Sequence, residues 1–120
     1  MVKSPKLRSL LTVIALVLGV GSAVQGLQAW SRDRLGSRVA SSARPGDIHM
    51  VSSVICPYCA DARAWFTDHG VAFTECFIER DEACASQYRA LMAPGTPVMV
   101  VRGRRLVGFD AGAVAAALVR

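Results

Sequence analysis

Charge is missing from one long stretch near the start of the sequence. Residues 9–31 carry no ionisable side chain. As a helix rising about 1.5 Å per residue, the stretch would reach roughly 34 Å, while the hydrocarbon core of a bilayer is about 30 Å thick. A buried core helix is a poor alternative, because no other predicted element is long enough to cover it. The sequence therefore predicts a transmembrane helix or a signal segment at 9–31.

Basic residues stand immediately before this apolar stretch. Lys3, Lys6 and Arg8 form a basic flank at residues 1–8. Such residues are retained on the cytoplasmic side, so the rest of the chain is predicted to face the periplasm. Two outcomes stay open at this point. The segment either anchors the protein as a single-pass membrane helix, or it is cleaved as a signal and the domain is released into the periplasm.

An excess of basic residues is missing from the rest of the chain. Residues 1–45 carry seven Lys or Arg and one Asp, whereas residues 46–120 carry seven Arg against eight Asp or Glu. The formal charge of +5 therefore belongs to the first part of the sequence. The remainder, at about −1, offers no basic surface for phosphates, which argues against nucleic acid as a partner.

Internal repeats and low-complexity tracts are also absent. Residues 32–46 are rich in Arg, Ser and Ala without a sustained apolar period, which predicts a linker. Residues 47–120 suffice for one small domain. Their apolar patterns, with Pro57 opening a helix and Gly70 closing it, predict the element order β-α-β-α-β-β-α.

The sequence Cys-Pro-Tyr-Cys follows the first predicted strand and opens the first helix of the domain. Free N–H groups and the helix dipole at such a position lower a cysteine pKa to about 3.5–7.5, from roughly 8.5. Cys56 is therefore the predicted nucleophile. Cys59 lies one helical turn further on, where it can attack a mixed disulfide on Cys56. A passive structural disulfide is the alternative for this pair.

This motif, the element order and the sequence Gly-Thr-Pro before the third strand resemble the glutaredoxin branch of the thioredoxin fold. The resemblance implies an α/β thioredoxin fold with a central four-stranded mixed sheet, preceded here by one transmembrane helix. It also implies a thiol–disulfide oxidoreductase that exchanges disulfides with protein thiols or glutathione. No bound cofactor and no metal are expected, and glutathione is a candidate co-substrate.

The resemblance further implies a substrate groove beside Cys56. Pro97 is expected to follow a cis peptide bond, so that a substrate chain or glutathione pairs with the backbone of Thr96 as an added strand. Tyr58 would offer a flat surface beside the sulfur. Thr96 stands where most glutaredoxins have valine.

Glutathione recognition is implied at two further positions. Gly108 and Asp110 are the candidates for holding the glutamyl end of glutathione, and Phe109 between them is a candidate for lining the groove. The lysine that many relatives carry just ahead of the cysteine motif is absent, because residues 52–54 are Ser, Ser and Val.

Two further cysteines, Cys76 and Cys84, lie at the end of the second predicted strand and the start of the second helix. In an oxidising compartment they are predicted to form a structural disulfide. Two buried thiols are an alternative. So is a zinc or iron–sulfur site built from all four sulfurs, although the C-x₇-C spacing differs from that of structural zinc sites. His49 and His69 have no partner motif and are given no catalytic role.

A non-catalytic role remains the alternative of a different class. A membrane-tethered thioredoxin-fold adaptor could use the groove around Pro97 to hold a partner polypeptide. An adaptor should survive the substitution Cys56→Ser, whereas an oxidoreductase should not.

Overall fold

The apolar residues that follow Gly46 form the first strand of the folded domain. The structure is a computed structural model that describes residues 4–119. Its first elements after that glycine are β1 (Ile48–Ser52), α2 (Pro57–Asp68), β2 (Thr74–Phe77) and α3 (Glu82–Leu91). The chain then forms β3 (Val98–Val101), β4 (Arg104–Val107) and α4 (Ala111–Leu118). This order confirms the predicted arrangement β-α-β-α-β-β-α.

The four strands form one mixed sheet in the order β2-β1-β3-β4. β1 runs parallel to β2 and antiparallel to β3, and β4 returns beside β3 as a hairpin. At the centre of the sheet, Val51 of β1 is paired with Val98 of β3. The loop after β1 and the loop before β3 therefore leave the sheet at the same edge.

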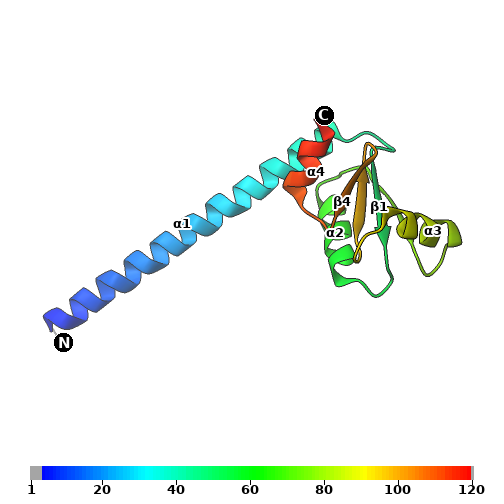
Figure 1. The fold of residues 1–120 in the computed structure, drawn as a ribbon. Coiled ribbons are helices and arrows are strands. Elements are labelled where there is room, and N and C mark those ends of the chain that lie inside the picture. Colours follow the sequence, from blue (N-terminus) through cyan, green and yellow to red (C-terminus); the bar gives the residue numbers. More distant parts are fainter. Residues whose placement is uncertain (1–3, 120) are drawn as a thin grey trace. The chain divides into compact units, whose positions relative to one another are not determined.

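Helices cover both faces of this sheet (Figure 1). One face packs against α2 and α4 in a core that includes Phe66 and Val114. The opposite face packs against α3, where Val51, Cys84 and Val98 are the buried members. Because neighbouring residues of a strand point to opposite faces, Met50 belongs to the first core and Val51 to the second. The chain therefore has the thioredoxin fold predicted from its sequence.

The N-terminal helix α1 (Pro5–Ser42) contains the uncharged stretch of the sequence. The chain divides into two compact units between Asp33 and Arg34, so α1 contributes residues to both. Within the first unit the apolar side chains are exposed, and Leu16, Val17 and Leu18 are 64–66 % accessible. Among residues 4–119, α1 is the one helix long and apolar enough to cross a membrane. Its length and composition suit either an anchor or a signal segment.

The last part of α1 belongs to the domain. The structure differs here from the predicted linker at 32–46, because the helix continues to Ser42 and Val39 is fully buried in the core beneath α2 and α4. Gly36 is also buried, and a Cβ atom at that position would overlap the ring of His69. Burial of a short apolar face outweighs the weak helix propensity of Gly and Ser in this segment.

Arg102 fastens the chain that follows this helix. Its guanidinium forms an ion pair with Asp47 at 3.2 Å and donates hydrogen bonds to the carbonyl oxygens of Ser42 and Leu118. The end of α1, the start of β1 and the end of α4 are thereby joined around one side chain. The division of the preceding residues into a flank at 1–8 and a membrane segment at 9–31 stays a prediction, and Lys3 and Arg120 lie outside the described residues.

The burial of Val39 generates a prediction about stability. Val39→Ala should lower the free energy of unfolding of a soluble fragment, residues 34–120, by about 2 kcal/mol, because two buried methyl groups are lost and a cavity remains. Val119→Ala is the matched control, since Val119 is 77 % exposed and its truncation should change stability by less than about 0.5 kcal/mol. Urea denaturation measures both. Equal stability of the two variants would show that residues 34–42 are not part of the core.

Candidate active site

Cys56 occupies the N-cap of α2. Its backbone is extended, with φ −97° and ψ 107°, and Pro57 takes the first position of the helix. The backbone N–H of Cys59 donates a hydrogen bond to the Cys56 sulfur at 3.1 Å. The sulfur therefore meets the unsatisfied N–H groups and the positive end of the helix dipole, a setting that favours a thiolate over a thiol.

The two cysteines of the motif form a disulfide with a Cα–Cα distance of 5.2 Å. They differ in exposure, since Cys59 is fully buried and Cys56 is partly accessible. A reagent or substrate approaching from solvent therefore reaches the Cys56 sulfur first. The roles of an attacking Cys56 and a resolving Cys59 stay predictions.

The loop that precedes β3 lies beside the Cys56 sulfur. The peptide bond between Thr96 and Pro97 is cis, as the resemblance predicted. The carbonyl oxygen of Thr96 lies 3.4 Å from the Cys56 sulfur, and Pro97 is buried. The antiparallel pairing of β1 with β3 brings these distant segments together, because both loops leave the same edge of the sheet.

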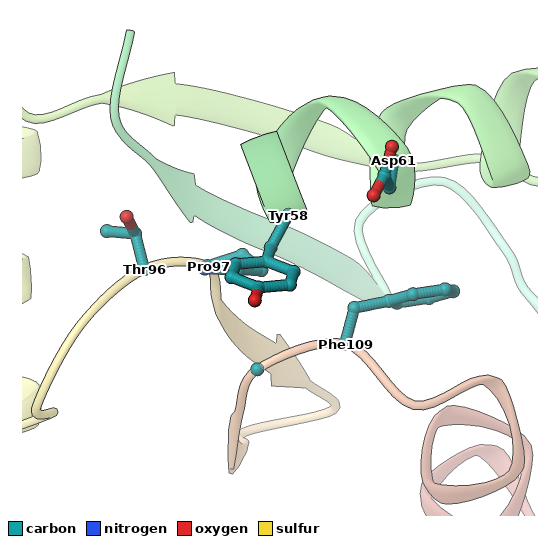
Figure 2. Close-up of a pocket in the computed structure, with 6 residues that line it drawn as sticks. Tyr58, Asp61, Thr96, Pro97 and Phe109 are labelled. Carbon is teal, nitrogen blue, oxygen red and sulfur yellow. The ribbon is translucent and has the colours of Figure 1, made fainter. Parts of the chain in front are cut away.

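A cavity of about 290 Å³ opens next to this pair of loops (Figure 2). It is lined by Tyr58, Asp61, Thr96, Pro97, Gly108 and Phe109. Four of these were predicted from the sequence as substrate-binding residues, and Phe109 was a candidate for lining the groove. Figure 2 shows Tyr58 and Asp61 on α2, with Phe109 across from them on the loop that leads to α4. Gly108 has a φ of 77°, which favours glycine where this loop turns.

Asp61 was missed by the sequence reasoning. It lies three residues after Tyr58, so both side chains occupy the same face of α2. That spacing was the available signal. Asp110, by contrast, does not line the cavity and instead caps α4, where its carboxylate accepts a hydrogen bond from the Ala113 N–H at 2.9 Å.

A carboxylate holds the segment between β1 and Cys56. The hydroxyl of Ser53 and the backbone N–H of Val54 both donate hydrogen bonds to Glu79, the second at 3.1 Å. The hydrogen bond from Ser53 has the largest effect on the pKa of Glu79 and lowers it. Burial raises the pKa by a smaller amount, and the bond from Val54 lowers it further. Glu79 therefore stays ionised and holds the segment just ahead of the motif.

A second carboxylate, Glu75 of β2, joins β2 to α2 and β1. Arg63 donates two hydrogen bonds to it, at 2.7 and 2.8 Å, and the Ser52 hydroxyl donates a third at 2.6 Å. Burial raises the pKa of Glu75, but the hydrogen bonds from Arg63 and Ser52 and the charge of Arg63 outweigh it, so the pKa lies below its usual value. The bidentate pair with Arg63 fixes the side of α2 that faces β2.

Cys76 and Cys84 are joined in a second disulfide with a Cα–Cα distance of 5.9 Å. It connects the edge strand β2 with the first turn of α3, and Cys84 is buried. His49 lies against it, with its Nε2 atom 3.4 Å from the Cys76 sulfur and its Nδ1 atom 2.7 Å from the Thr74 hydroxyl. The sequence reasoning assigned no partner to His49, because β1 and β2 are distant in sequence.

Among residues 4–119, no cluster of three or more His, Cys, Asp or Glu side chains is placed to hold a metal ion. All four sulfurs are paired in the two disulfides. The cysteine pairs, the Thr96–Pro97 loop and the adjoining cavity make up the candidate site.

This combination of sheet, cysteine pair and cis-proline loop defines the thioredoxin class of folds. Residues 48–106 match the family model described as Glutaredoxin. The chain thus carries a domain of the glutaredoxin family.

Solved structures agree with this fold. A thioredoxin-like protein is 23 % identical, covers 62 % of this chain and 96 % of its own, and has a TM-score of 0.53. Wheat glutaredoxin is 20 % identical, with coverages of 71 % and 88 % and a TM-score of 0.52. Glutaredoxin from Archaeoglobus fulgidus is 19 % identical, with coverages of 62 % and 86 % and a TM-score of 0.50. No curated protein matches the chain.

The second disulfide generates a prediction about stability and activity. The double substitution Cys76→Ser, Cys84→Ser should lower the free energy of unfolding by about 2.5 kcal/mol, the chain-entropy value for so short a loop. Disulfide-exchange rates measured well below melting should stay near those of the parent. Peptide mapping without reduction gives the direct measurement, and free thiols at both positions in periplasmic protein would contradict a structural disulfide. Loss of exchange activity would instead make this a second redox pair.

Proposed function

We propose that the chain is a glutaredoxin-like thiol–disulfide oxidoreductase that acts through Cys56 and Cys59. One observation carries the proposal: the partly exposed Cys56 sulfur caps α2 and accepts the Cys59 N–H, while Cys59 itself is buried. The helix terminus and the Cys59 N–H are placed to stabilise a thiolate on Cys56. Protein thiols and disulfides are the proposed partners, with glutathione as a candidate co-substrate.

The exchange consists of two balanced steps. The thiolate of reduced Cys56 attacks one sulfur of a substrate disulfide, forming a mixed disulfide and releasing the other sulfur as a thiolate. The thiolate of Cys59 then attacks the Cys56 sulfur, which releases the second substrate thiolate and leaves the Cys56–Cys59 disulfide. Two electrons pass from the cysteine pair to the substrate. The reverse sequence oxidises a substrate dithiol, and the reduction potential of the pair decides the direction.

The roles of the two cysteines can be separated by trapping. Cys59→Ser should accumulate a mixed disulfide between Cys56 and a substrate, because the resolving sulfur is gone. Cys56→Ser should form none and should lose essentially all exchange activity. Alkylation of the reduced parent below pH 7 should label Cys56 first, since it is the accessible and more acidic thiol. Mass spectrometry of the trapped species measures each result.

The opposite pattern would contradict the proposal in a specific way. Preferential labelling of Cys59 would reverse the assigned roles. Full biological function of Cys56→Ser, with no exchange activity in the parent, would favour the non-catalytic adaptor. Stoichiometric zinc or iron in protein purified without air would favour a metal-binding role for the cysteines.

We also propose that α1 anchors the domain to the membrane and that the domain faces the periplasm. The exposed apolar side chains of α1 support this, since a helix that is apolar on all sides is stable in lipid and not in water. The basic flank at residues 1–8 supports the orientation. Cleavage of the uncharged stretch at residues 9–31 as a signal would place the same domain free in the periplasm.

A reporter fusion tests this topology. A reporter that is active only in the cytoplasm, attached after Arg120, should stay silent, and one that is active only in the periplasm should give signal. Resistance of the protein to carbonate extraction should separate an anchor from a cleaved signal. A bright cytoplasmic reporter would contradict the proposed orientation.

A further inference from the structure

The cavity beside Cys56 contains no positive charge. Of its six lining residues, Asp61 is the one that is charged. No arginine of the described residues 4–119 lines this cavity, and the sequence has no lysine after Lys6. Several arginines of the domain are engaged elsewhere, namely Arg63 with Glu75, Arg89 with Glu82, Arg102 with Asp47, and Arg105 with the carbonyl oxygens of Leu91 and Met92.

The Asp61 carboxylate is available to a ligand. Within the described residues 4–119, it takes part in no hydrogen bond or ion pair. It lies one helical turn after Tyr58, so it shares a face of α2 with the aromatic side chain beside the redox pair. Two other carboxylates adjoin the site, Glu79 through its bonds to Ser53 and Val54, and Asp110 at the cap of α4. The side chains of these three residues therefore all bring negative charge to the surroundings of the site.

Exposed apolar side chains next to Cys56 form an apolar rim of the site. Ile55, directly before the reactive cysteine, is 85 % exposed, and Tyr58, two residues after it, is 73 % exposed. Val54 is also exposed, and Phe109 contributes an aromatic ring from the other side. Exposed apolar side chains gathered around a reactive group indicate contact with the side chains of a polypeptide.

Glutathione matches this surface poorly. At neutral pH it carries two carboxylates and one ammonium group, so its net charge is negative. A site that binds it needs cationic or N–H donors for the carboxylates, and the cavity offers one carboxylate in their place. Like charges repel at the distance of a bound ligand, which disfavours glutathione and favours a substrate of opposite charge.

We propose that the site selects polypeptide disulfides with a basic side chain next to the cysteine, and that Asp61 is the residue that sets this preference. This inference rests on the proposed oxidoreductase function and names the substrate class of the same site. The apolar rim contacts the substrate chain beside its cysteine, while the Asp61 carboxylate forms an ion pair with a substrate Lys or Arg. Cys56 then attacks the substrate disulfide by the two steps given above.

Single-turnover kinetics test the proposal on the full-length protein in neutral detergent. The protein is reduced with dithiothreitol, freed of it, and mixed with one of three disulfides. Two are cyclic peptides that differ in one respect, since lysines flank the cysteines in the first and glutamates in the second. The third is oxidised glutathione. The basic peptide should react about fivefold faster than the acidic peptide or glutathione, the size expected for one solvent-exposed ion pair.

Charge substitutions on α2 identify the responsible residue. Asp61→Asn should remove most of the preference, and Asp61→Lys should invert it, so that the acidic peptide and glutathione react faster than the basic peptide. Asp68→Lys is the matched control, because it makes the same change of charge at an exposed position near the end of the same helix. It should keep the preference of the parent. High salt should reduce the preference in the parent.

Each alternative result of these experiments contradicts one part of the proposal. If the parent reacts equally with all three disulfides or fastest with glutathione, the proposed substrate class is wrong while the oxidoreductase function stands. If Asp68→Lys changes the preference as much as Asp61→Lys, the overall charge and not Asp61 sets it. If the reduced protein reacts with none of the three, the oxidoreductase function is wrong, and the substrate class with it.

Discussion

The antiparallel pairing of β1 with β3 is the constraint on which the site depends. With Val51 opposite Val98, the loop that ends in Cys56 and the loop that contains Thr96 and Pro97 emerge at one edge of the sheet. The Cys56 sulfur then lies 3.4 Å from the Thr96 carbonyl oxygen, because the strand register brings the two loops together. A shift of one residue in this register would turn Val51 out of its core and would separate the two loops.

The reactive sulfur is stabilised by a helix in otherwise negative surroundings. The N-terminus of α2 supplies a partial positive charge and an N–H donor to Cys56. Asp61 and Glu79 act in the opposite direction, because nearby carboxylates disfavour a thiolate. The hydrogen bonds from Ser53 and Val54 hold Glu79 in its place ahead of the motif. Stabilisation of a thiolate on Cys56 therefore depends on backbone dipoles and not on side-chain charges, which is compatible with the proposed role of Asp61 in substrate preference.

Local sequence signals predicted the fold and the cysteine pair, but they did not predict the contacts between segments distant in the sequence. Alternating apolar residues, Pro57 and Gly70 were sufficient for the order of elements, since each signal acts within its own strand or helix. The contact of His49 with Cys76 depends on the β1–β2 register, which no local pattern encodes. The burial of Val39 was missed for a related reason. The short apolar face of residues 34–42 can be recognised only when the core against which it packs is known.

The two disulfides differ in what their cleavage releases. Cys56 and Cys59 are three residues apart at the first turn of α2. The helix already fixes the backbone between them, so their bond adds almost no further constraint. Cys76 and Cys84 are eight residues apart and connect β2 with α3 around a loop, so their bond removes conformational freedom from the unfolded chain. The first pair can therefore open and close at little cost to the fold, whereas opening the second weakens the attachment of α3 to the sheet. Under the proposed function, chain geometry therefore favours redox cycling at the helix terminus, while the second disulfide holds α3 to the sheet.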